Sequence, residues 1–181
     1  MKKSRLVQVS FLVLMLQAAQ ASELEALSAR EQLGQMIFFD TRLSEPAGQA
    51  CATCHAPGRA FSDPDEHAPT SRGVLPGRMG SRNTPSVMYA RYSPAFHFDP
   101  KEEHYVGGQF WDGRAATLEE QTKAPFLNPL EMANPDRQSV VEKIRMASYA
   151  PLFETVFGKG ALEHTDEAYA RIAEALAAFH R

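Results

Sequence analysis

The feature that most constrains this chain is the pentapeptide Cys51-Ala52-Thr53-Cys54-His55, which holds both cysteines of the 181-residue sequence. Cys-x-x-Cys-His is the signature of covalent c-type haem attachment. Two thiols one helical turn apart can add to the two vinyl groups of haem, and the adjacent imidazole then lies under the iron as its proximal ligand. We therefore expect one covalently bound haem c, held by Cys51, Cys54 and His55.

A cysteine pair of this kind also occurs in zinc sites, thioredoxin-like redox sites and structural disulfides. A zinc site needs about four protein ligands, and no second cysteine pair is present. A thioredoxin-like site belongs in a βαβ context, which the sequence pattern does not show. A structural disulfide stays open for an exported chain. Export also favours haem, because c-type maturation takes place outside the bacterial cytoplasm.

Residues 1–21 have the three parts of a secretory signal peptide. Lys2, Lys3 and Arg5 precede an apolar run over residues 6–16, and Ala19-Gln20-Ala21 is a small-x-small cleavage site. The apolar run is shorter than the roughly 20 residues that span a bilayer. We predict cleavage after Ala21, a periplasmic mature chain over residues 22–181 and no membrane span.

Composition and charge exclude several classes of protein. The formal net charge is −3, and loss of the three basic residues of the leader would make it −6. This balance leaves no basic footprint for nucleic acid. With 44% hydrophobic and 23% charged residues, the chain is too apolar to be disordered. Its length suits one domain with a hydrophobic core.

The expected secondary structure is mostly α with an irregular centre. Helices are predicted over residues 22–43 and Ala50–Ala56, then from Thr117, after Asp136, over Tyr149–Phe157 and from Thr165 onward. Residues 44–100 carry eight of the 12 prolines and show no clear strand alternation. A long irregular segment is usually functional. Its aromatic side chains are expected to pack on a cofactor; they are Phe61, Tyr89, Tyr92, Phe96 and Phe98.

Two of the expected helices are amphipathic. In residues 22–43, apolar side chains recur at spacings of three and four, and Ser22 is predicted to cap the helix. Thr165 is predicted to cap the last helix. That helix has one apolar face, made of Tyr169, Ile172, Leu176 and Phe179.

Haem alone does not distinguish an enzyme from an electron carrier. A monohaem electron-transfer cytochrome c needs a sixth iron ligand, commonly methionine. The downstream candidates are Met79, Met88, Met132 and Met146. Methionine more often fills a core than binds iron, so this alternative stays open.

The chain resembles the bacterial dihaem cytochrome c peroxidases and the related MauG-type proteins, through a series of motifs in fixed order. The motifs are Leu33-Gly34, FFDTRLS over residues 38–44, Cys51–His55, Phe61-Ser62-Asp63, RNTPS over residues 82–86, FWDGRA over residues 110–115, LEEQ over residues 118–121, NPLEM over residues 128–132 and ALAAF over residues 175–179. The resemblance implies a cytochrome c-like haem domain with long irregular Pro/Gly-rich loops. It also implies reduction of hydrogen peroxide to water.

The resemblance implies roles for single residues around the peroxide site. His55 matches the proximal ligand of the N-terminal, peroxidatic haem. Glu131 matches the distal carboxylate, which would move a proton between the peroxide oxygens as the O–O bond breaks. Gln121 matches a distal polar residue that orients peroxide. Without the resemblance, Glu131 would be interpreted as a helix-capping carboxylate.

The resemblance also implies one residue for electron transfer and one for metal binding. Trp111 matches the tryptophan on the electron path between two haems, although a single tryptophan would otherwise be interpreted as core. Asn83 matches a side chain of a calcium site between two haem domains, in line with the preference of calcium for oxygen ligands. The electron donor implied is a small redox protein, a cytochrome c or a cupredoxin.

The chain departs from the family pattern where the better-known peroxidases carry a distal histidine. Residues 70–75 (TSRGVL) contain none; outside the Cys51–His55 motif, His67 lies a few residues before this loop, and His97 and His104 lie after it. We therefore expect a peroxidatic iron without a protein distal ligand, as in the MauG-like branch, where a partner protein is the substrate.

The second departure is the family's other Cys-x-x-Cys-His motif, which does not occur in this sequence. The expectation is a single haem domain over residues 22–181, with a separate second haem domain as a candidate partner. Two alternatives remain, a monohaem electron-transfer protein and a truncated, inactive fragment.

Overall fold

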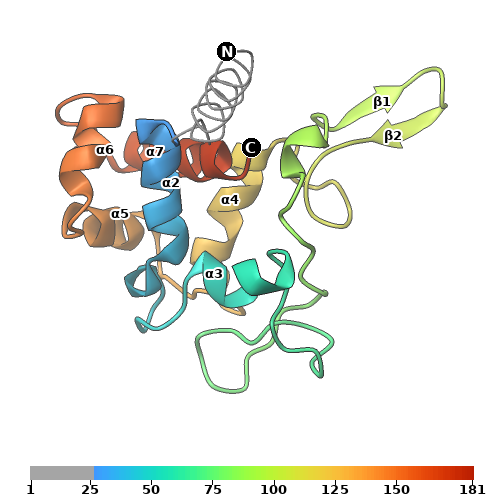
Figure 1. Cartoon of the computed structure of the whole chain (residues 1–181), viewed down its shortest axis with the longest axis horizontal. Helices are drawn as coiled ribbons and strands as arrows, with labels where there is room; N and C mark the ends of the chain where they lie inside the picture. Colours follow the sequence, from blue (N-terminus) through green and yellow to red (C-terminus); the bar gives the residue numbers. More distant parts are fainter. Residues whose placement is uncertain (1–26) are drawn as a thin grey trace, which may run out of the picture.

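The computed structural model describes residues 27–181, so the predicted signal peptide and the predicted Ser22 cap lie outside the described residues. The described chain is mostly helical, as expected. Its helices are α2 (Ala29–Phe39), α3 (Cys51–Cys54), α4 (Leu118–Leu127), α5 (Arg137–Arg145), α6 (Ala150–Phe157) and α7 (Thr165–Phe179). Figure 1 shows α2, α5, α6 and α7 gathered on one side of the molecule. Within residues 27–181, no helix combines the length and apolarity needed to cross a membrane.

Helix α2 is shorter than the predicted helix over residues 22–43. It starts after Ser28, whose hydroxyl accepts a hydrogen bond from the backbone of Glu31 while the Glu31 carboxylate accepts one from the backbone of Ser28. This reciprocal pair is a capping box. The helix ends at Phe39, four residues before the predicted end, and the Asp40 side chain that follows accepts a hydrogen bond from the backbone of Arg42 at 3.0 Å.

Helices α2 and α7 cross at close range, and Gly34 makes the crossing possible. A Cβ atom on Gly34 would lie 2.0 Å from the carbonyl oxygen of Ala175 and 2.9 Å from Cβ of Phe179. No side chain fits at that distance. The Leu33-Gly34 motif therefore serves helix packing.

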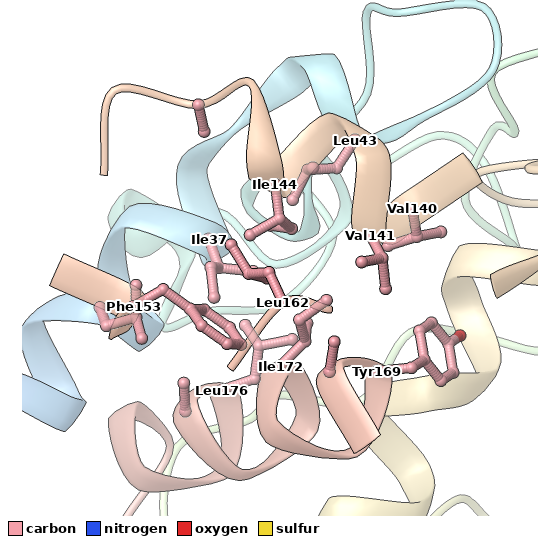
Figure 2. Packing of buried hydrophobic residues seen from close by; sticks show 14 of the residues in the cluster. Ile37, Leu43, Val140, Val141, Ile144, Phe153, Leu162, Tyr169, Ile172 and Leu176 are labelled. Carbon is pink, nitrogen blue, oxygen red and sulfur yellow. The ribbon is translucent and has the colours of Figure 1, made fainter. Parts of the chain in front are cut away.

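The hydrophobic core fills the space between α2, α5, α6 and α7 (Figure 2). Ile37 of α2, Ile144 of α5, Phe153 of α6 and Ile172 of α7 are all fully buried. In α7 the buried positions include Ala168, Tyr169, Ile172 and Leu176. These follow the predicted apolar face, with Phe179 at its half-buried end.

The predicted helix starts are confirmed at two positions and wrong at a third. The Thr117 hydroxyl accepts from the backbone of Glu120 at 3.2 Å at the start of α4. Asp136 accepts from Ser139 at 2.8 Å at the start of α5. The predicted Thr165 cap of α7 is wrong, because Thr165 is the first helical residue and His164 occupies the cap position without a side-chain hydrogen bond.

The central segment is irregular, as predicted, but it ends in a hairpin that the sequence pattern did not indicate. Strand β1 (His97–Asp99) pairs antiparallel with β2 (His104–Val106), with Phe98 opposite Tyr105. Figure 1 shows this hairpin projecting away from the helices. Two three-residue strands without a buried face are too short to produce a visible alternation.

The expected packing of the central aromatic residues on a cofactor is wrong for most of them. Phe61 packs against the hydrophobic core. Tyr92, Phe96 and Phe98 are exposed. The rings of Phe96 and Phe98 contact Tyr105 of the hairpin and not a cofactor cavity. Of the five aromatic residues, Tyr89 is the one that lines the large cavity described below.

Candidate functional site

A cavity of about 400 Å³ lies where α3, α4 and the end of α7 meet the irregular segment. This volume falls in the range of small-molecule and cofactor sites, roughly 300–1,000 Å³. Much of its wall is apolar; these side chains include Phe38, Pro85, Val87, Met88, Leu118, Pro125, Met132 and Leu176. The cavity therefore suits a large apolar ligand with a few polar attachment points.

The Cys-x-x-Cys-His motif forms one wall of this cavity. Cys51 and Cys54 are the first and last residues of α3, so their thiols lie one helical turn apart, and both line the cavity together with His55. His55 follows the helix, with its backbone N–H bonded to the Cys51 carbonyl at 2.9 Å. Its ring Nδ1 lies 3.1 Å from the Phe61 carbonyl oxygen. Because a carbonyl oxygen only accepts, Nδ1 is the N–H donor of this contact, and in the neutral ring Nε2 then carries the lone pair that a metal needs.

The environment of the motif suits haem attachment better than thiol redox chemistry. Burial raises the pKa of Cys51 to about 12 and also raises that of Cys54. A redox-active cysteine pair instead needs a lowered thiol pKa. Burial lowers the pKa of His55, and a neutral imidazole is the form that binds iron. Both cysteines are free thiols.

One face of α4 forms a second wall. Leu118, Gln121, Thr122 and Pro125 all line the cavity. Their spacings of three and four place them on one helical face. Gln121 is half-buried on this face. Pro125 lacks an N–H and cannot bond the Gln121 carbonyl four residues earlier, so this turn of the helix has one backbone hydrogen bond fewer.

Glu131 lies in the same cavity as Gln121 and His55. Burial raises its pKa above the ordinary value of 4.5, although a hydrogen bond from the Asn128 side chain and the charge of Arg114 act in the opposite direction. A half-buried carboxyl group with a raised pKa is suited to exchanging a proton. The structure therefore brings together the two predicted distal residues and the predicted proximal histidine.

The segment that carries Glu131 is held by the loop that lacks the distal histidine. The backbone N–H of Val74 bonds the Glu131 carbonyl at 2.9 Å. A Cβ atom on Gly73 would lie 2.4 Å from the Leu130 carbonyl oxygen, so a residue with a side chain does not fit here. Residues 70–75 therefore serve to fix the position of Glu131.

Trp111 and Asn83 lie at the rim of the cavity. The indole N–H of Trp111 donates to the Asn83 carbonyl at 2.7 Å, yet the residue is 63% exposed. Asp112 bridges Arg82 and Arg114 at 2.6 and 2.8 Å, and hydrogen bonds from these two arginines lower its pKa. Because its side chain is exposed at the rim, Trp111 is not the core residue that its hydrophobicity alone would indicate.

Asn83 is not placed in a metal cluster by the side chains that the structure describes. Its side-chain amide donates to the Pro69 carbonyl at 3.4 Å. Within residues 27–181, no group of three or more His, Cys, Asp or Glu side chains is arranged to hold a metal ion. The calcium site remains a prediction from the resemblance.

The candidate distal histidines lie away from the cavity. His67, His97 and His104 do not line it and are exposed. Of the candidate methionines, Met88 and Met132 line the cavity, whereas Met79 does not and Met146 is 75% exposed.

Sequence reasoning missed two polar residues of this cavity, Gln49 and His180. Within residues 27–181, Gln49 Oε1 and both ring nitrogens of His180 are the buried side-chain polar atoms without a hydrogen-bond partner. Both residues line the cavity. A signal existed for His180, because it lies four residues after Leu176 on the apolar face of the last helix. Gln49 has no signal beyond its position two residues before Cys51.

These observations fit a haem group. Buried polar atoms without partners are rare in native structures and indicate a missing ligand, ion or water. Here they border a largely apolar cavity that is also lined by two thiols and by the imidazole of His55, whose Nδ1 contacts the Phe61 carbonyl. Cys51, Cys54 and His55 would hold the haem, with the α4 face and Glu131 around it.

Comparisons with known proteins agree with this site. The family model of di-haem cytochrome c peroxidase matches residues 28–181. The chain is 48% identical to the methylamine utilization protein MauG of Paracoccus denitrificans over 159 residues, which is 86% of this chain and 40% of that protein. It is 35% identical to the cytochrome c551 peroxidase of Nitrosomonas europaea, over 70% of this chain and 33% of that protein.

A solved structure shows the same fold. The crystal structure of the diheme peroxidase BthA from Burkholderia thailandensis matches with a TM-score of 0.79 and 35% sequence identity. The match covers 86% of this chain and 39% of that one. The cytochrome c-like helical fold is thereby confirmed. The chain spans 40% or less of the length of these relatives.

Proposed function

This chain belongs to the di-haem cytochrome c peroxidase family, and we propose that it is a c-type haem peroxidase domain that reduces hydrogen peroxide to water. The observation that carries this proposal is one cavity containing Cys51, Cys54 and His55 together with Gln121 and Glu131. The first three residues would hold haem c. The other two provide the polar groups that peroxide needs.

Glu131 is proposed to move the proton. The overall reaction consumes one peroxide, two electrons and two protons and yields two waters. Haem, when bound, supplies the iron that exchanges electrons with peroxide. The Glu131 carboxylate accepts the proton of one peroxide oxygen and returns it to the other. Gln121, half-buried on α4, donates a hydrogen bond that orients the peroxide molecule.

Trp111 is proposed to lie on the route by which electrons arrive. It is exposed at the rim, and its hydrogen bond to Asn83 fixes the indole ring. An aromatic ring that lies partly in the cavity and partly on the surface suits electron entry from a docked partner. The proposed partners are a small donor, a cytochrome c or a cupredoxin, and a second haem domain, with calcium bound near Asn83. The proposed location is the periplasm.

Electron transfer without catalysis is the second candidate function. Met88 and Met132 both line the cavity, and either thioether is of the type that can fill a sixth iron position. This candidate requires a low-spin haem and no dependence on Glu131. Modification of a partner protein, which the resemblance to MauG-type proteins implies, would use the same peroxide site and share the need for Glu131.

Haem content and spin state test the proposal. The full chain, produced in a host that matures c-type cytochromes, is expected to show haem that acidified solvent does not extract. Cys51→Ala combined with Cys54→Ala should abolish this covalent haem. A resting ferric high-spin spectrum and peroxide turnover with a reduced donor are the expected results. Extractable haem would contradict the attachment, and a low-spin haem inert to peroxide would favour electron transfer.

A further inference from the structure

A second histidine, His180, lines the cavity that contains His55. It follows α7 directly and continues the series Ile172 and Leu176 at a spacing of four, so it lies on the face of the helix that points inward. Leu176 also lines the cavity. A polar side chain therefore occupies the cavity end of an otherwise apolar helix face.

The His180 ring is fixed by aromatic neighbours. It lies edge-on to Phe38, with ring centroids 5.4 Å apart and planes at 90°, and 6.1 Å from the Phe179 ring. Phe38 in turn lies 5.9 Å from the ring of Phe61, whose carbonyl contacts Nδ1 of His55. Two phenylalanines thus connect His180 to the proximal histidine, and the packing holds the imidazole in place.

The ring nitrogens of His180 need a partner that residues 27–181 do not supply. Both nitrogens are buried, and neither makes a hydrogen bond within the described part of the chain. Burial lowers the pKa of His180 to about 4, with a smaller effect of His55. A neutral imidazole has one N–H donor and one acceptor nitrogen. Leaving both unpaired costs free energy, so the group that fills the cavity is the natural partner.

We propose that His180 is a haem-contacting residue whose ring N–H donates a hydrogen bond to an oxygen that enters with the haem. That oxygen belongs either to a propionate carboxylate or to a water ordered against the porphyrin. The inference rests on the proposed haem site. It adds a residue that none of the peroxidase motifs includes.

The test compares four haem-loaded full-length proteins: wild type, His180→Gln, His180→Leu and His164→Leu. His180→Gln keeps an N–H donor, and His164 is an exposed histidine next to the same helix. We expect the haem midpoint potential to shift in His180→Leu. In His180→Gln and His164→Leu it should stay near the wild-type value. Resonance Raman bands of propionate bending should shift together with the potential if a carboxylate is the acceptor. A shift in potential alone indicates water.

Two outcomes overturn the inference. One is a His180→Leu protein with the midpoint potential and Raman bands of His164→Leu. If His180→Leu does not retain haem, NMR spectra of the wild-type ferrous carbon monoxide complex test the contact between His180 and haem instead. In that diamagnetic form, the ring protons of a haem-contacting His180 show large ring-current shifts in NMR spectra, and ordinary chemical shifts would overturn the contact. Wild type without covalent haem would refute the proposed function as well.

Discussion

At the scale of single residues, Glu131 differs from the other carboxylates of residues 27–181. It lines the cavity, it is half-buried, and its pKa is raised by burial. Asp112, at the rim, has its pKa lowered by hydrogen bonds from two arginines. Only a carboxylate with a raised pKa both accepts and returns a proton readily near neutral pH.

Glu131→Gln is therefore expected to lower kcat/KM for hydrogen peroxide about a hundredfold or more, in line with the usual contribution of general acid–base catalysis. The glutamine keeps the shape of the side chain but cannot accept the proton. Steady-state peroxidase kinetics provide the measurement, with covalent haem content as a check on folding. The matched control is Glu102→Gln on the exposed hairpin. Equal activity in the two variants would remove Glu131 from the mechanism.

The pH dependence of the same reaction follows from the raised pKa of Glu131. Because burial holds the proton on this group to higher pH than the ordinary value of 4.5, the active carboxylate form is lost as pH falls through the raised pKa. We expect kcat/KM to increase with pH, with a midpoint above 4.5. This acid limb should disappear in Glu131→Gln. A midpoint at or below 4.5 in the wild type would show that another group is titrating.

At the scale of elements, the crossing of α2 and α7 depends on Gly34. An alanine within a helix is normally stabilising relative to glycine by roughly 0.5–1 kcal/mol. At Gly34 the added Cβ would lie 2.0 Å from the Ala175 carbonyl oxygen, so the helices would have to move apart. We expect Gly34→Ala to lower the free energy of unfolding by about 1–3 kcal/mol, as overpacked cores do.

Denaturant unfolding measures this effect. Gly58→Ala is the matched control, because nothing lies within 4 Å of the Cβ that it adds. Its free energy of unfolding should stay within about 0.5 kcal/mol of the wild-type value. An equally stable Gly34→Ala protein would mean that the two helices can separate without cost.

The elements that sequence reasoning predicted are those with local signals. Caps and apolar periodicity located α4, α5 and α6 closely, because capping residues such as Thr117 and Asp136 act on their own neighbours. The grouping of Cys51, Cys54 and His55 on one wall of the cavity could be predicted for the same reason. The roles of Gly73, Gln49 and His180 could not, since each depends on a segment remote in sequence. Such approaches are set by tertiary packing, which no local pattern records.

At the scale of the whole molecule, the chain has two regions of different character. The core of Figure 2 is formed by residues before 44 and after 115. Between Cys51 and Arg114, Ser71 is the one buried residue. This middle region forms much of the cavity wall, so we infer that the haem provides a large part of the surface on which it folds.

Removal of the haem is therefore expected to loosen the molecule unevenly. In the Cys51→Ala/Cys54→Ala chain, amide hydrogens between residues 51 and 114 should exchange much faster than in the haem-bound protein. Those of α2, α5 and α7 should stay protected, because most of their buried side chains pack on one another and only Phe38 and Leu176 of these helices' buried core side chains also line the cavity. Hydrogen exchange followed by mass spectrometry measures both regions in one experiment. A uniform loss of protection, including α2 and α7, would show instead that haem and helices form a single cooperative unit.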